Sequence, residues 1–172
     1  MHSVEYLVVG GTAVALHGYF RRSHDQSGRL IEKHDLDFWY NPTYENYFKL
    51  LNALEELGLD VTEFKEEVAP NPKKSFFRLE QEDFKMDFLP ELPGLSRFRS
   101  SFNNRIVSNI QEIEVPYINY DELIESKRAL ARSQDIDDIE IHNWPLGPFK
   151  CNLIQNFSRE GEFESTWHHI EF

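Results

Sequence analysis

The sequence has little cysteine, no long apolar run and few positive charges. A single cysteine, Cys151, cannot form an internal disulfide, which is typical of a protein in a reducing compartment. No apolar run approaches the roughly 18 to 20 residues that a membrane span needs. The first residues also lack the charged, apolar and cleavage segments of a secretory signal. We therefore expect a cytoplasmic protein that does not interact with a membrane.

Positive charge is scarce, with 18 Lys and Arg residues against 30 Asp and Glu residues and a net charge of −12. Nucleic-acid binding depends on cations that neutralise phosphates, so this balance opposes a general nucleic-acid-binding protein. A local basic face remains open, and so does a solvated mixed surface at each cluster. The clusters are Arg21 with Arg22, Lys73 with Lys74, and Arg97 with Arg99 and Arg105.

Apolar periodicity predicts an α+β (α/β) chain of strands and helices, with helices toward its C-terminal end. Apolar residues make up 40% of the chain and aromatic residues 14%, enough for one hydrophobic core. We expect one domain over 1–142, a C-terminal extension of unclear structure over 143–172, and a loop over 20–33. The predicted elements are strands 4–9, 34–40, 75–79, 84–89, 106–107 and 113–118, and helices 12–18, 43–57 and 122–132, with Asp121 as cap of the last and a further helix from Ser133.

The most informative stretch is the predicted strand His34–Tyr40. Asp35 and Asp37 stand two residues apart in an apolar, aromatic run, so both point to the face opposite Leu36 and Phe38. Two carboxylates held side by side on a half-buried strand repel each other unless a cation lies between them. The pattern therefore predicts a divalent metal site.

A third acid lies on the later strand 84–89. Phe84, Met86 and Phe88 share one face of this strand, which leaves Lys85 and Asp87 on the other. An unpaired acid is unfavourable among such apolar neighbours, so Asp87 also points to a functional site.

A glycine pair, Gly10–Gly11, follows the first strand and precedes a short helix from Thr12. Paired glycines let a ligand approach the main chain closely, and the N–H groups at the start of a helix attract anions. A phosphate group fits this position. An ordinary tight turn between strand and helix is the alternative.

Taken in order, the glycine pair, the Asp-x-Asp strand and the later aspartate resemble the polymerase-beta-like nucleotidyltransferase superfamily. More narrowly, residues 6–18, then Arg22, then Asp35-Leu36-Asp37 are similar to the bacterial minimal nucleotidyltransferases of the AbiEii toxin-like group. The stretch 123–138 also fits that group through Lys127, Arg132, Asp135 and Asp138. The resemblance covers residues 4 to about 141.

The resemblance implies a mixed sheet with helices on one side, and an enzyme that moves a nucleoside monophosphate from an NTP such as ATP to a hydroxyl group. It implies Asp35, Asp37 and Asp87 as catalytic acids and as ligands of Mg²⁺ or Mn²⁺, with Asp87 assisting deprotonation of the acceptor. Two such ions can activate the hydroxyl and neutralise the pyrophosphate. The implied nucleotide contacts are Gly10, Gly11, Thr12, Arg22 and Lys127. Lys127 corresponds to the lysine that contacts a phosphate in the family. The alternative is that Lys127 is an ordinary helix lysine in solvent.

The sequence does not identify the acceptor or the partner. The acceptor is an RNA end such as that of tRNA, a protein hydroxyl or a small molecule, and the group predicts a toxin–antitoxin or phage-defence pair with a cognate antitoxin. Relatives carry a helix before the first strand, whereas here Val4 lies almost at the start, which predicts a shortened form or cover from a partner chain. The link between Arg22 and Asp35 is longer than in relatives, and 143–172 matches no element of the family.

A competing hypothesis is a nucleotidyltransferase fold without turnover that binds nucleotide or a protein partner. The presence of all three acids favours an enzyme. No zinc site is assigned, because no histidine has a suitable spacing to acids or to Cys151. The histidines considered are His24, His34, His142, His168 and His169.

Overall fold

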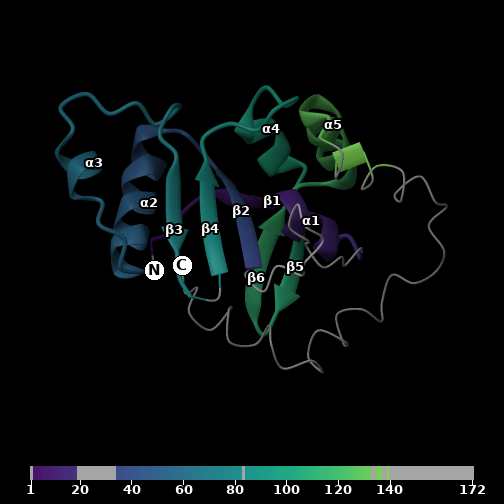
Figure 1. Cartoon of the computed structure of the whole chain (residues 1–172), viewed down its shortest axis with the longest axis horizontal. Helices are drawn as coiled ribbons and strands as arrows, with labels where there is room; N and C mark the ends of the chain where they lie inside the picture. Colours follow the sequence, from purple (N-terminus) through teal and green to yellow (C-terminus); the bar gives the residue numbers. More distant parts are fainter. Residues whose placement is uncertain (1, 19–33, 83, 133–134, 137–138, 140–172) are drawn as a thin grey trace.

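The computed structural model describes residues 2–18, 34–82, 84–132, 135–136 and 139. Arg22, the loop predicted for 20–33 and the extension 143–172 lie outside these residues. Figure 1 shows one sheet with helices arranged around it. No helix in the described part of the chain combines the length and apolarity needed to cross a bilayer.

A six-stranded mixed sheet forms the centre of the fold, with strand order β3-β4-β2-β1-β6-β5. β2 runs parallel to β4 and β1 runs parallel to β6, while the remaining neighbours are antiparallel. The predicted α+β class is therefore confirmed. The strands are β1 (Tyr6–Val9), β2 (His34–Tyr40), β3 (Phe77–Glu80), β4 (Phe84–Leu89), β5 (Ile106–Ile110) and β6 (Ile113–Tyr117).

The helices are α1 (Gly10–Leu16), α2 (Tyr44–Glu56), α3 (Thr62–Glu66), α4 (Phe98–Asn103) and α5 (Tyr120–Leu130). The Thr43 side chain accepts the Asn46 N–H and caps α2, as Ser, Thr, Asp and Asn do at helix starts.

Two predictions about helices were wrong, and two short helices were missed. Asn119, not Asp121, caps α5, since its side-chain oxygen accepts the Glu122 N–H at 3.0 Å. α1 begins at Gly10 rather than Thr12, so both glycines belong to its first turn. The short helices α3 and α4 were not predicted at all, because five or six residues give too little periodicity to recognise.

Helices cover both faces of the sheet, so the implied arrangement with helices on one side is wrong. In Figure 1, α2 and α3 lie at the left and α1 and α5 at the right. Side chains alternate along β2, and each face therefore has its own core. One core holds Leu36 and Phe38 against Leu50 and Leu54 of α2. The other holds Leu7, Val9 and Trp39 against Val14 of α1, Phe98 of α4 and Leu123 of α5.

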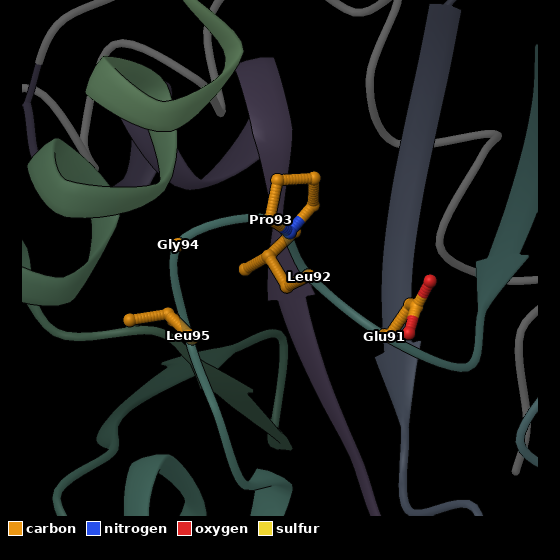
Figure 2. A pocket seen from close by; sticks show the side chains of 5 residues that line it. All are labelled: Glu91, Leu92, Pro93, Gly94 and Leu95. Carbon is orange, nitrogen blue, oxygen red and sulfur yellow. The ribbon is translucent and has the colours of Figure 1, made fainter.

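The connection between β4 and α4 packs tightly against α5. Gly94 has a φ of +83°, and a Cβ atom there would lie 2.9 Å from the Ala129 Cβ and 3.0 Å from the Glu125 carbonyl oxygen. Only glycine fits both the backbone conformation and the space. The same connection lines a hollow of about 350 Å³ (Figure 2), bordered by Glu91, Leu92, Pro93, Gly94 and Leu95. Glu91 is the one ionisable side chain of this lining, and it points away from Leu95.

Candidate metal centre

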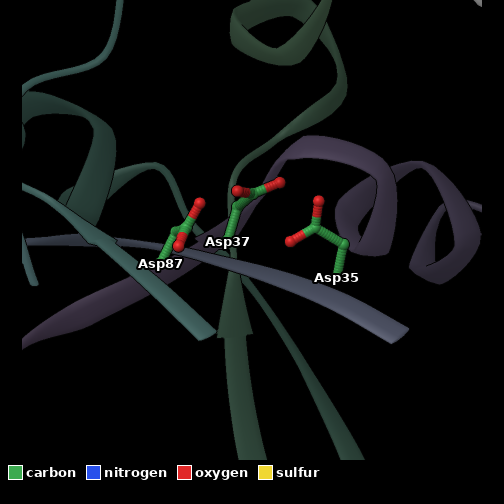
Figure 3. Close-up of side chains that lie close together, drawn as sticks. All are labelled: Asp35, Asp37 and Asp87. Atoms are coloured by element: carbon green, nitrogen blue, oxygen red, sulfur yellow. The ribbon is translucent and has the colours of Figure 1, made fainter. Parts of the chain in front are cut away.

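Strand pairing brings the three predicted acids together. β2 and β4 run parallel, and their register places Asp37 beside Asp87 and Asp35 beside Lys85. These four side chains therefore form a rectangle of charges on one face of the sheet. Figure 3 shows the three carboxylates on the same side of the strands.

Apolar neighbours determine the direction in which the acids point. Leu36 and Phe38 of β2, like Met86 and Phe88 of β4, are buried in the core beneath α2. Because successive strand side chains point to opposite faces, the acids between them must face the side of α1. Exposure decreases across the site, from an exposed Asp35 through a partly buried Asp37 to a buried Asp87.

The acidic triad, Asp35, Asp37 and Asp87, has the geometry of a metal-binding group. One carboxylate oxygen from each acid can be chosen so that all three lie within 4.8 Å of one another. Hard cations such as Mg²⁺ bind carboxylate oxygens at roughly 2.0–2.1 Å, so small side-chain rotations bring all three oxygens onto one ion. Within the described residues, no other group of three or more acids, histidines or cysteines is close enough to do the same.

Two cations that the sequence interpretation did not assign to the site contact the triad. Arg78 of β3 faces Asp87 in the β3–β4 register and donates to both of its oxygens, with Nε–Oδ1 at 2.7 Å and Nη2–Oδ2 at 2.8 Å. Lys85 Nζ lies 3.0 Å from Asp35 Oδ1 and 3.6 Å from Asp87 Oδ2. Burial by itself would lower the pKa of Lys85, but its hydrogen bond to Asp35 and the two negative charges outweigh burial and raise it. The ammonium therefore stays charged inside the site.

Asp37 is the acid whose charge is least favourable. Burial, followed by the negative charges of Asp35 and Asp87, raises the pKa of Asp37 to about 7, although Lys85 and Arg132 oppose this change. An ordinary aspartate has a pKa near 3.9. The folded chain thus keeps an acid in the centre of the triad that readily takes up a proton, and a divalent ion would favour its ionised form.

The start of α1 lies directly against Asp37. Gly10 has a φ of +61°, and a Cβ atom there would lie 2.9 Å from the Asp37 Cγ. The position therefore needs glycine both for its backbone conformation and for the close approach. Gly11 is exposed, with open space around its Cα. Thr12 Oγ1 donates to the Asp35 carbonyl oxygen at 3.2 Å and ties the helix to β2.

Lys127 is buried, so the alternative that it is a helix lysine in solvent is wrong. It is 4% exposed, and its Nζ lies 3.3 Å from Oδ1 of the fully buried Asp135. Arg132 also binds Asp135, with Nε–Oδ2 at 2.6 Å, and its charge is close enough to lower the pKa of Asp37. Burial opposes ionisation of Asp135, but the Arg132 hydrogen bond and the Lys127 charge lower its pKa. Contact between Lys127 and a phosphate stays a prediction.

The structure thus places Asp35, Asp37, Asp87 and Gly10 in one site, with Gly11 and Thr12 in the adjoining helix turn, and embeds Lys127 in the neighbouring ion-pair cluster. Arg78, Lys85 and Arg132 were missed as site residues. The available signal was that Lys85 shares a strand face with Asp87. No protein-family model matches the chain, and no curated protein is significantly similar to it.

Proposed function

We propose that this chain is a metal-dependent nucleotidyltransferase of the polymerase-beta-like type, which moves a nucleoside monophosphate from an NTP to a hydroxyl acceptor. The observation that carries the proposal is the acidic triad, three carboxylates on adjacent parallel strands with oxygens within 4.8 Å. Three carboxylates placed together repel one another, and burial adds to the cost of the charge on Asp37, so the arrangement is unfavourable for a sheet that needs only to be stable.

In this proposal Asp35, Asp37 and Asp87 hold Mg²⁺ or Mn²⁺. When bound, the ion supplies Lewis-acid activation and neutralises charge on the phosphates. The acceptor oxygen forms a bond to the α-phosphorus, the bond to the bridging oxygen breaks, pyrophosphate leaves, and the hydroxyl proton passes to solvent. Both oxygens of Asp87 already accept N–H groups from Arg78. We therefore propose Asp87 as a metal ligand rather than as the group that takes the acceptor proton.

We further propose that the triphosphate lies at the first turn of α1, beside Gly10, Gly11 and Thr12, because this turn adjoins Asp37. The acceptor is a tRNA or other RNA end, a protein hydroxyl or a small molecule. An antitoxin or another partner chain would fit the group that the sequence resembles. The surplus of acidic residues, 30 against 18 basic ones, favours a local rather than a general contact with RNA.

The glycine turn gives a test of the nucleotide position. Gly11→Ala is expected to fold normally, because open space surrounds its Cα, and to weaken binding of a non-hydrolysable NTP with Mg²⁺ by placing a methyl group at the phosphates. Gly10→Ala is expected to destabilise the fold by at least about 1–2 kcal/mol through its left-handed backbone, and further through collision with Asp37. Calorimetric titration measures the affinity and circular dichroism the folding. Unchanged NTP affinity in a folded Gly11→Ala protein would remove the turn from the nucleotide site.

A second candidate is a nucleotidyltransferase fold that binds nucleotide or a partner without turnover. The ion pairs favour this candidate, because Arg78 and Lys85 already compensate much of the negative charge of the acidic triad without any metal. In this case the acids would form a structural charge network. The two candidates differ in whether label is transferred covalently.

The deciding experiment incubates the full chain with each NTP labelled on its α-phosphate, in Mg²⁺ or Mn²⁺, with and without total tRNA. Nucleotidyl transfer places the label on tRNA or on the protein itself and releases pyrophosphate. NTP labelled on the γ-phosphate is the matched control and should leave no label, while EDTA should abolish the reaction. Saturable nucleotide binding without transfer to tRNA, protein or a panel of small hydroxyl acceptors would support the second candidate.

A further inference from the structure

Lys85 lies within the acidic site and not at its border. It takes the fourth corner of the rectangle formed with Asp35, Asp37 and Asp87, since it pairs with Asp35 across the parallel strands and precedes Asp87 by two residues. Its side chain is 24% exposed, so the ammonium is held near the acids and not extended into solvent. Its two acid partners are both members of the acidic triad.

The contacts of Lys85 fall on oxygens that a second metal ion would need. Two catalytic ions about 3.5–4 Å apart would need carboxylates that both ions can share. Lys85 contacts Oδ1 of Asp35 at 3.0 Å and Oδ2 of Asp87 at 3.6 Å. Arg78 also donates to both oxygens of Asp87. Each carboxylate oxygen has two lone-pair positions. Lys85 and Arg78 thus face both positions of Asp87 Oδ2, one of Asp87 Oδ1 and one of Asp35 Oδ1, which leaves fewer positions for ions that share these two carboxylates.

The balance of charge in the site also favours one metal ion. Arg78 and Lys85 together bring two positive charges to the acids, as many as one Mg²⁺. One ion together with these two side chains therefore supplies the positive charge that two ions supply in a site without such cations. A second ion would add two charges next to an ammonium and a guanidinium that are already bound, and repulsion would oppose its entry.

We propose that the acidic triad binds a single divalent ion and that Lys85 is a built-in cation that takes the place of a second ion. This inference rests on the proposed function and deepens it. Lys85 is then a positioning residue that holds Asp35 and Asp87 in place for the one ion. Because Lys85 and Thr12 of α1 both contact Asp35, the ammonium would also attract phosphates at the first turn of α1.

The experiment counts Mn²⁺ ions per chain by electron paramagnetic resonance, with a non-hydrolysable NTP at saturation. Wild type is expected to bind one ion. Lys85→Met keeps the length of the side chain but removes its charge, and is expected to bind two, with a signal broadened by coupling between neighbouring ions. Lys85→Arg keeps the charge and is expected to bind one. Lys49→Met, which removes an exposed lysine paired with Glu45 on α2, is the matched surface control and is expected to bind one.

Two ions in wild type, or a single ion in folded Lys85→Met, would overturn the role of Lys85 and leave the proposed nucleotidyltransferase intact. If folded wild type binds no Mn²⁺ with or without NTP, the metal site itself is wrong, and the proposed function fails with it. Circular dichroism confirms folding of each variant. Lys85→Gln replaces Lys85→Met, with the same expectation, if the methionine protein is unfolded. The count in wild type tests the single ion, and the count in the uncharged variant tests whether Lys85 excludes the second.

Discussion

Without metal, Asp37→Asn is expected to stabilise the folded chain at pH 8 by about 2–4 kcal/mol. Burial and the charges of Asp35 and Asp87 raise the pKa of Asp37 to about 7, so at pH 8 the fold must carry an unfavourable charge that asparagine lacks. Each pKa unit is worth about 1.4 kcal/mol, and the change from the ordinary value sets the upper end of this range. The amide matches the carboxyl group in size, so the packing against Gly10 is kept.

The difference in stability between wild type and Asp37→Asn should increase as the pH rises. The folded chain holds a proton on Asp37 up to about pH 7, whereas the unfolded chain releases it near pH 4. Protonation therefore stabilises the fold fully below about pH 4, and this contribution is lost as pH rises through 7. Urea unfolding of wild type and Asp37→Asn in EDTA should coincide near pH 4 and diverge progressively up to pH 8. Glu82→Gln, an exposed change in the β3–β4 turn, should show no such divergence.

The same variant should lose function. A divalent ion at a hundred times its dissociation constant stabilises wild type by roughly 2.7 kcal/mol, and Asp37→Asn should lose this response because the central ligand is gone. Transfer of α-phosphate label should fall to background. The proposed function therefore predicts an Asp37→Asn protein that is more stable than wild type and has lost the transfer. If Asp37→Asn instead destabilised the metal-free chain at pH 8, Asp37 would be a structural residue.

Asp135→Asn is expected to lower the free energy of unfolding by about 3–5 kcal/mol. Asp135 is fully buried and binds Lys127 at 3.3 Å and Arg132 at 2.6 Å. Removing its charge leaves the buried Lys127 ammonium without this counterion, and breaking a buried pair on one side costs that amount. Lys127→Met should cost less, since Arg132 still compensates Asp135.

A double-mutant cycle measured by urea unfolding tests this pair. Lys127→Met combined with Asp135→Asn should be less destabilised than the sum of the two single changes, because no buried charge remains uncompensated. Glu45→Gln breaks the exposed Glu45–Lys49 pair and serves as the control, with little change expected. Strictly additive effects would contradict a buried pair. A Lys127→Met protein of wild-type stability with reduced NTP affinity would favour the phosphate contact instead.

Several local features followed from the residues alone. The period of two along β2 places Asp35 and Asp37 on the face opposite Leu36 and Phe38, whatever strand lies next to it. Thr43 caps α2 because a hydroxyl oxygen meets an N–H three residues later. Such interactions span a few residues, so the chain encodes them before it folds.

The register of the β3–β4 hairpin could not be predicted from local sequence. A loop at 80–83, as predicted, would pair Leu79 with Phe84 and thus Arg78 with Lys85. The structure extends β3 to Glu80 and pairs Arg78 with Asp87. Moving the turn by one residue along the chain shifts the partner of Arg78 by two positions, and the position of the turn depends on how the whole hairpin packs.

Only the tertiary structure decided how the site is electrically balanced. Asp87 lies fifty residues after Asp37, and the parallel pairing of β4 with β2 that brings them together depends on the order of strands in the whole sheet. The burial of Lys127 depends likewise on the side of α5 that faces the sheet. The sequence by itself determined which residues are acidic and the direction in which each points from its own strand. The sheet decided which cations compensate them, because electrostatic interactions act through space between segments that are distant along the chain.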